Sequence, residues 1–130
     1  MHVMFDRELA GKILSQILES AERILIRFEP VTSSDFFMES EENLEKLDGI
    51  CMQLIVIGES LKNFDKLAGT DFLGKYSQVD WQRAKAIRDI ISHHYINLDA
   101  EVVFDVCQEK IPQMIPVLKQ MIADVEKGNF

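Results

Sequence analysis

Residues 87–96, with the sequence IRDIISHHYI, place an arginine, an aspartate, a serine, two adjacent histidines and a tyrosine among isoleucines. Arginine carries a planar, permanently charged group that binds phosphate, and histidine can transfer a proton near neutral pH. Together these two side-chain types have what cleavage of an RNA phosphodiester without a metal requires, with the RNA 2′-hydroxyl as the attacking group. The simpler alternative is that the segment is only the polar end of a packing helix.

Helical geometry separates the two side chains that could act together. At about 100° per residue, Arg88, Ser92 and Tyr95 share one face of a helix. Arg88 and His93 are about 140° apart, so within one rigid helix they would not meet on a small target. Asp89 and His93 are four residues apart, so we expect that the carboxylate can orient the imidazole and favour its protonated form.

The isoleucines define a second face of the same predicted helix. We expect the core face to contain Ile87, Ile90, Ile91 and His94. His94 is therefore either a histidine at the edge of the core or of an interface, or a second proton carrier beside the predicted site.

The elements that must position this segment are predicted to be helices. Apolar residues recur at steps of three and four residues, the period of an amphipathic helix. The expected long helices cover about 6–28, 43–67, a segment that begins at Trp81 and includes the quoted residues, and 99 to near the end, with a short helix at 34–40 and a loop at 67–80. The predicted N-caps are Asp6, Asp80 and Asp99, and Ser34 or Asp35 for the short helix. We therefore predict an all-α fold in one domain, residues 1–130: an antiparallel bundle of four long helices plus a short helix.

Two local features refine this bundle. Gly58 lies inside the second long helix, where glycine costs roughly 1 kcal/mol relative to alanine, which suggests a close backbone contact at that point. Pro112 and Pro116 each remove a backbone donor from the last helix, so we expect a kink or a restart near Ile111.

Composition and charge limit the possible functions. The net charge is −8, from 14 basic and 22 acidic residues, which argues against a broad, sequence-independent grip on nucleic acid but allows a small local site. Residues 81–88 contain three basic side chains and no acidic one before Asp89.

No apolar run approaches the roughly 20 residues of a membrane span, and the beginning of the chain lacks the apolar stretch of a signal peptide. We therefore expect a cytoplasmic protein without membrane association. Cys51 and Cys107 are predicted to be small core residues rather than metal ligands or redox groups.

The segment RDIISHHY has the pattern R-x4-H-x-Y, and so resembles the motif of HepT-like toxins in the HEPN superfamily. The resemblance continues over nearly the whole chain in order and spacing. IVIGESLKNF (55–64) resembles the central helix of that family, Trp81 stands before the motif, and VVFDVCQEKIPQM (102–114) resembles the helix that follows it.

The resemblance implies an all-helical homodimer. Active members are metal-independent endoribonucleases with a composite active site in a cleft at the dimer interface, and no cofactor is implied. By this resemblance Arg88 would bind the scissile phosphate of the RNA substrate, and His93 would act as acid or base. A site built from two copies also removes the angular difficulty, because Arg88 of one chain can approach His93 of the other.

The resemblance also implies a partner and a mode of regulation. Family members are typically encoded beside a nucleotidyltransferase of the MNT type, which serves as the antitoxin of a toxin–antitoxin pair. In characterised pairs this partner transfers AMP to the motif tyrosine, here Tyr95, and silences the toxin. The added anionic group, seven residues from Arg88 on the same face, would occupy the phosphate site.

One position departs from the family pattern. Many relatives have asparagine after the arginine, whereas this chain has Asp89, whose charge should weaken phosphate binding unless it pairs with His93 or Arg88. Asp89, Ser92, His94 and Glu59, which matches the family's Gly-Glu, are assigned supporting roles. The alternative function is a non-catalytic helical binding module that docks a nucleotidyltransferase or a nucleotide.

Overall fold

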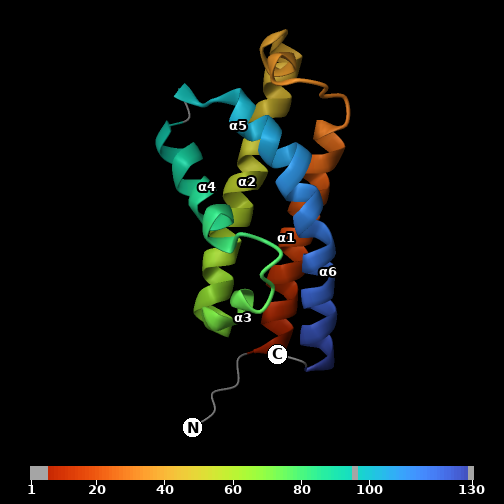
Figure 1. Ribbon diagram of the computed structural model, residues 1–130, viewed down its shortest axis with the longest axis vertical. Helices are drawn as coiled ribbons and strands as arrows, with labels where there is room; N and C mark the ends of the chain where they lie inside the picture. The colour runs from red at the N-terminus through yellow and green to blue at the C-terminus, as the bar shows by residue number, and fades with distance from the viewer. Residues whose placement is uncertain (1–5, 95–96, 129–130) are drawn as a thin grey trace.

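The computed structural model describes residues 6–94 and 97–128, and all regular elements in these ranges are helical (Figure 1). The long helices are α1 (Arg7–Phe28), α2 (Glu41–Ala68), α4 (Trp81–His94) and α6 (Ile111–Lys127). The shorter elements are the 3-10 helix η1 (Ser34–Met38), α3 (Asp71–Gly74), α5 (Ala100–Asp105) and a π-helical segment, η3 (Val106–Lys110). The predicted all-α fold with four long helices is confirmed.

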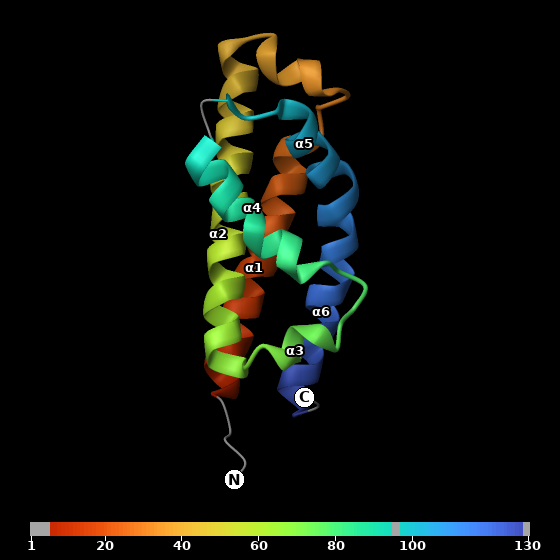
Figure 2. The ribbon, with the colours of Figure 1, turned by 60° about the vertical axis from the view of Figure 1, so that its left-hand side comes forward.

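The long helices run up and down the molecule in alternation. In Figure 1, α1 rises from the bottom, α2 descends, α4 rises again, and α5 with α6 descends to the C-terminal end. Helix α1 packs against both α2 and α6, while α4 packs mainly against α2 and lies at the outside of the bundle (Figure 2). The motif helix is therefore covered on one side by α2.

Helix α2 supplies the longest buried stripe of the core. The stripe consists of Leu47, Ile50, Leu54, Ile57, Leu61 and Phe64, spaced alternately by three and four residues. Each of these side chains is at most 4% exposed. This spacing keeps one face of α2 against its neighbours over the whole helix, as expected for helices packed nearly antiparallel.

The predicted N-caps of three helices form as expected. The carboxylate of Asp6 accepts a hydrogen bond from Leu9 N at 3.1 Å. Asp80 accepts one from Arg83 N at 3.1 Å. Each bond satisfies a backbone donor that has no partner inside the helix.

Asp99 is likewise the N-cap of α5 and accepts a hydrogen bond from Glu101 N at 2.9 Å. The short helix differs from the prediction, because its N-cap is Ser33 rather than Ser34 or Asp35, and Ser33 makes no side-chain capping bond. Contacts with the bundle hold this helix instead: Phe37 is fully buried, and Asn43 Nδ2 donates to the carbonyl of Phe36.

The predicted loop at 67–80 contains the short helix α3. Three side chains of the 67–80 segment are buried against the core: Phe72, Leu73 and Tyr76. The indole of Trp81 donates a hydrogen bond to the carbonyl of Tyr76 at 2.9 Å. This segment therefore fixes the start of α4, and the prediction of an irregular loop was incomplete because it neglected these anchors.

The last helix changes its hydrogen-bonding pattern near Ile111, the position predicted from Pro112 and Pro116. The π-helical segment ends at Lys110, α6 begins at Ile111, and Pro112 occupies its first turn. A π-helical turn accommodates a residue that the i→i−4 pattern cannot. Of the predicted kink or restart near Ile111, the structure has a restart of α-helical hydrogen bonding after the π-helical segment.

The predicted core face of α4 was wrong at one position. Ile91 is buried and Ile87 is half-buried, but Ile90 is 47% exposed. Because α4 packs mainly against α2, only a narrow face is covered, and Ile90 lies about 100° from Ile91. The side chain of His94, also assigned to that face, lies outside the described residues.

Both cysteines are core residues, as predicted. Burial raises the pKa of the Cys51 thiol to about 12, with a smaller contribution from Asp48. Burial, with a smaller effect of Cys51, also raises the pKa of Cys107 to about 12. Among the described helices, none is long and apolar enough to span a bilayer.

Candidate functional site

The motif helix lies in close contact with α2 at a glycine. A Cβ atom added to Gly58 would lie 2.6 Å from Cβ of Arg88, and 3.3 and 3.4 Å from the carbonyl oxygens of Lys85 and Ala84. Real Cβ atoms do not tolerate the first of these distances, so glycine is what permits this packing. The predicted close contact at Gly58 is confirmed, and its counterpart is the motif arginine.

Two carboxylates hold the guanidinium of Arg88 at this contact. Its Nε lies 3.2 Å from Oε2 of Glu59, the residue that follows Gly58 on α2. Its Nη1 donates to Oδ1 of Asp89 at 3.0 Å. Nε is buried and makes no hydrogen bond of acceptable geometry. Its contact with Glu59 is therefore an ion pair without a hydrogen bond.

Asp89 bridges the two helices. Its oxygens Oδ1 and Oδ2 lie 3.4 and 3.3 Å from Nζ of Lys62 on α2. Hydrogen bonds from Arg88 and then from Lys62 hold the pKa of Asp89 below its usual range. Of the two pairings predicted for Asp89, the one with Arg88 forms; within the described residues no hydrogen bond joins Asp89 to His93.

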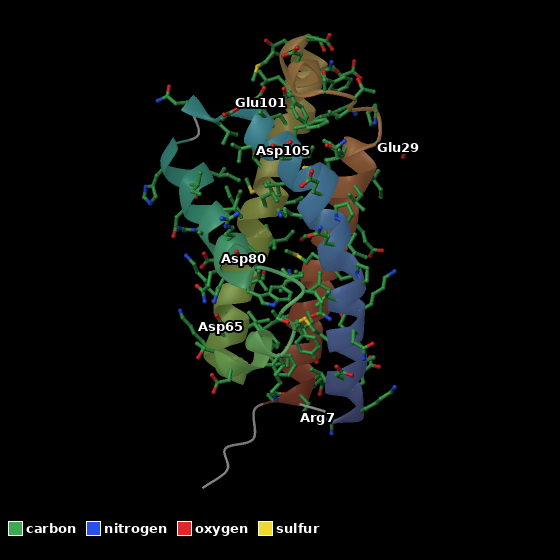
Figure 3. The ribbon with its side chains drawn as sticks, in the orientation of Figure 1. Arg7, Glu29, Asp65, Asp80, Glu101 and Asp105 are labelled. Carbon is green, nitrogen blue, oxygen red and sulfur yellow. The ribbon has the colours of Figure 1, made fainter. Side chains whose placement is uncertain are left out.

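A third ion pair continues the series along the contact between α2 and α4. Nζ of Lys85 lies 2.5 Å from Oδ2 of Asp65, and the two side chains are 14% and 11% exposed. Figure 3 shows the labelled Asp65 on α2, toward the lower end of that helix. Oδ1 of Asp65 is buried without a hydrogen-bond partner. We call the pairs Glu59–Arg88, Lys62–Asp89 and Asp65–Lys85 the α2–α4 ion-pair series.

A shallow pocket of about 350 Å³ opens beside this series and is lined by Lys62, Asp65, Gln82, Lys85, Ala86 and Asp89. A larger open groove of about 800 Å³ lies between α1 and α6, away from the motif. There Arg7 donates to the carbonyls of Val125 and Glu126 at the end of α6. These bonds give Arg7 a structural role as a C-terminal cap. We therefore look for the functional site around Arg88, which the smaller pocket borders at Asp89.

The motif residue His93 and its neighbour Ser92 lie in the last turn of α4. Ser92 and His93 are exposed, whereas Arg88 is drawn toward α2 by its ion pair with Glu59. The structure therefore does not join Arg88 and His93 through any hydrogen bond or ion pair between described residues. Tyr95 and the side chain of His94 lie outside the described part of the chain.

Two residues that form ion pairs beside Arg88, Lys62 and Asp65, were not predicted from the sequence. Lys62 and Asp65 follow Gly58 at intervals of four and seven residues, which places all three on one face of α2. This spacing was a usable signal, once Gly58 had been recognised as the point of close approach. Across the residues described, no group of three or more His, Cys, Asp or Glu side chains is arranged to hold a metal ion.

Fold and site together define an all-helical protein whose motif arginine is fixed at a glycine contact between two helices. Residues 17–121 match the family described as HepT-like, "Ribonuclease HepT-like". The chain belongs to this HepT-like family, as its motif predicted.

Two curated relatives agree with this assignment, and both carry the name "Putative RNase". One, from Methanocaldococcus jannaschii, is 30% identical over 113 residues, which cover 87% of each chain. The other, from Caldanaerobacter subterraneus subsp. tengcongensis, is 25% identical over 109 residues, covering 84% of this chain and 90% of the relative. No solved structure gives a significant match.

Proposed function

We propose that this protein is an endoribonuclease that cleaves RNA without a metal ion. Arg88 binds the scissile phosphate, and His93 transfers protons as acid or base. The observation that carries the proposal is the placement of Arg88: Gly58 leaves room for its Cβ against α2, and Glu59 forms an ion pair with its guanidinium there. Membership of the ribonuclease HepT-like family supports the same chemistry.

The reaction needs only groups of the protein and the RNA. A base takes the proton of the 2′-hydroxyl, the O2′–P bond forms, and the P–O5′ bond breaks as an acid protonates the leaving 5′-oxygen. The products are a 2′,3′-cyclic phosphate and a 5′-hydroxyl. Arg88 stabilises the negative charge that develops on the phosphate oxygens.

The active site is composite and lies at the interface of a homodimer. Arg88 and His93 are about 140° apart on α4, and Arg88 is engaged on the α2 side. Ile90, three residues before His93 and therefore on the same face, is a large apolar side chain left 47% exposed. A second copy packed on this face would cover Ile90, and by the family resemblance the second copy would supply its own His93 to Arg88.

The protein acts as the toxin of a toxin–antitoxin pair in the cytoplasm. Its antitoxin is an MNT-type nucleotidyltransferase that silences it by adenylylation of Tyr95. The resemblance of the motif supports this regulation, and so does the predicted position of Tyr95 on the face of Arg88. An AMP group at that position would compete with RNA for the arginine.

A second candidate function is a non-catalytic module that docks a nucleotidyltransferase or a nucleotide. It is favoured by one observation: Glu59 and Asp89 both lie against the guanidinium of Arg88. Two carboxylates offset the charge that a phosphate would bind. The two functions differ in whether the unmodified protein cuts RNA.

That difference is tested with purified, unmodified protein and RNA in EDTA. The protein is compared with Arg88→Ala, His93→Ala and the control Arg83→Ala, whose side chain is 83% exposed on the same helix. We expect cleavage by the native protein and the control, with losses of about 100-fold or more in the first two variants. No cleavage by the native protein, or cleavage that survives both substitutions, would exclude the catalytic function.

The regulation is tested separately. After incubation with the partner nucleotidyltransferase and ATP, a mass spectrum of the peptide containing Tyr95 should show an added AMP. An unmodified Tyr95 would contradict the proposed silencing while leaving the nuclease proposal in place.

A further inference from the structure

We propose that Lys62 is a positioning residue that draws Asp89 away from Arg88 when RNA binds. This inference rests on the proposed ribonuclease function and names a residue outside the R-x4-H-x-Y motif. Lys62 would not touch the reacting atoms; it would act on the arginine through the aspartate.

The need for such a residue follows from the charges around Arg88. Its guanidinium faces two half-exposed carboxylates, Glu59 at 53% and Asp89 at 49% exposure. With Nε paired to Glu59 and Nη1 donating to Asp89, a phosphate must compete for donors that are already engaged. Bidentate binding of a phosphate uses two neighbouring N–H groups of the guanidinium. Either pair of neighbouring nitrogens, Nε with Nη2 or Nη1 with Nη2, includes one that a carboxylate already contacts. Release of the Asp89 carboxylate would free Nη1 and restore positive charge for the phosphate.

Asp89 is the carboxylate that has another cation available. Its Oδ1 is shared between Arg88 at 3.0 Å and Lys62 at 3.4 Å, and its Oδ2 already lies 3.3 Å from Lys62. A small rotation of the Asp89 side chain would leave Arg88 and keep the ion pair with Lys62. Lys62 is itself 37% exposed, and its long, flexible side chain can follow this movement.

The neighbouring lysine does not replace Lys62 in this role. Lys85 contacts Asp65 at 2.5 Å in the least exposed pair of the series. Removing Lys85 from that pair would leave the Asp65 carboxylate without its cation in a largely buried position, which is costly. Among the described residues, Lys62 is the cation on α2 that contacts Asp89.

The inference makes the effect of Lys62 depend on Asp89. Without the lysine, Asp89 would have Arg88 as its remaining partner, and RNA would bind more weakly. With asparagine at position 89 there is no charge to draw away, so loss of Lys62 would matter little. A lysine that contacted RNA directly would instead be needed in both backgrounds.

A double-mutant cycle tests this dependence. Lys62→Met, Asp89→Asn and the double variant are compared, with Lys66→Met as a control that removes a charge from an exposed position one turn further along α2. The measurements are kcat and KM for a short RNA at fixed salt, and the Kd of a 2′-O-methyl form that cannot be cleaved. Lys62→Arg, which keeps the charge, is included to test for rescue.

We expect Lys62→Met to raise KM and Kd about three- to five-fold, the effect of one half-exposed ion pair, with little change in kcat. Asp89→Asn should lower both constants, Lys62→Arg should restore them, and Lys66→Met should leave them unchanged. In the Asp89→Asn background, Lys62→Met should change them less than about two-fold.

An equal loss in both backgrounds would overturn the inference and identify Lys62 as a direct RNA contact. No effect of Lys62→Met in a protein that cleaves RNA would overturn it as well, while the ribonuclease function would stand. If the native protein neither binds nor cleaves RNA, the proposed function fails, and this inference fails with it.

Discussion

The contact at Gly58 gives a sharp prediction for Gly58→Ala. The new Cβ would lie 2.6 Å from Cβ of Arg88 and 3.3 Å from the carbonyl oxygen of Lys85. Neither atom is the free end of a flexible side chain, so α2 and α4 must move apart. Overpacking of this kind costs about 1–3 kcal/mol, against a gain of about 1 kcal/mol from replacing glycine inside a helix.

Gly11→Ala is the matched control. Gly11 lies inside α1, and no atom comes within 4 Å of the Cβ it would gain. The gain in helix propensity is common to both variants and cancels in their comparison. The difference between their free energies of unfolding is therefore the overpacking cost, about 1–3 kcal/mol in favour of Gly11→Ala.

Urea unfolding measured by circular dichroism gives these free energies. All proteins are compared at one concentration, because the stability of the proposed dimer would depend on it. Gly58→Ala should also displace Arg88 and lower RNA cleavage, by up to about 100-fold for a shift near 1 Å. If Gly58→Ala is stabilised as much as Gly11→Ala, the close contact does not exist and the argument for the position of Arg88 fails.

Three further predictions concern the scaffold. Asp99→Ala should lower the free energy of unfolding by about 1 kcal/mol through loss of the N-cap, and an unchanged urea midpoint would contradict this. Tyr76 donates a 2.6 Å hydrogen bond that lowers the pKa of Asp124; the stabilisation is present above the usual carboxyl pKa and lost as pH falls through the lowered value. Tyr76→Phe should therefore lower the Tm at pH 7 but much less at pH 2–3, whereas an equal drop at both pH values would refute the coupling. Cys51 and Cys107, buried with pKa values raised to about 12, should resist a thiol reagent at pH 8 until the protein unfolds, and rapid labelling of the folded protein would contradict their burial.

Features that depend on neighbours along the chain could be predicted from the sequence. The caps at Asp6, Asp80 and Asp99 each involve a donor two or three residues away, so local spacing was sufficient. The restart near Ile111 followed from the effect of proline on backbone hydrogen bonding. The contact at Gly58 was expected because glycine inside a helix has a stability cost that packing can explain.

Features that depend on the arrangement of the helices could not be predicted in the same way. A helical wheel shows which residues share a face, but not how much of that face a neighbour covers, and so Ile90 was wrongly assigned to the core. The pairing of Lys62 with Asp89 joins residues 27 positions apart, and it depends on the register between α2 and α4. The motif led to the proposal of Arg88 and His93 as site residues, while the register determines which charges surround the arginine.

In the proposed function, Arg88 and His93 act together across two chains. This joint action is tested by mixing purified Arg88→Ala and His93→Ala proteins, unfolding and refolding them together, and measuring RNA cleavage in EDTA. In a mixed dimer, one composite site lacks both residues and the other contains both intact residues.

About half of the dimers formed at random are mixed, and each has one complete site of two, so about a quarter of the native activity is expected. The separately refolded variants should remain inactive and serve as the baseline. Recovery to about a quarter of native cleavage is the result that the composite site predicts. A refolded mixture that contains mixed dimers but is as inactive as its two components would contradict it.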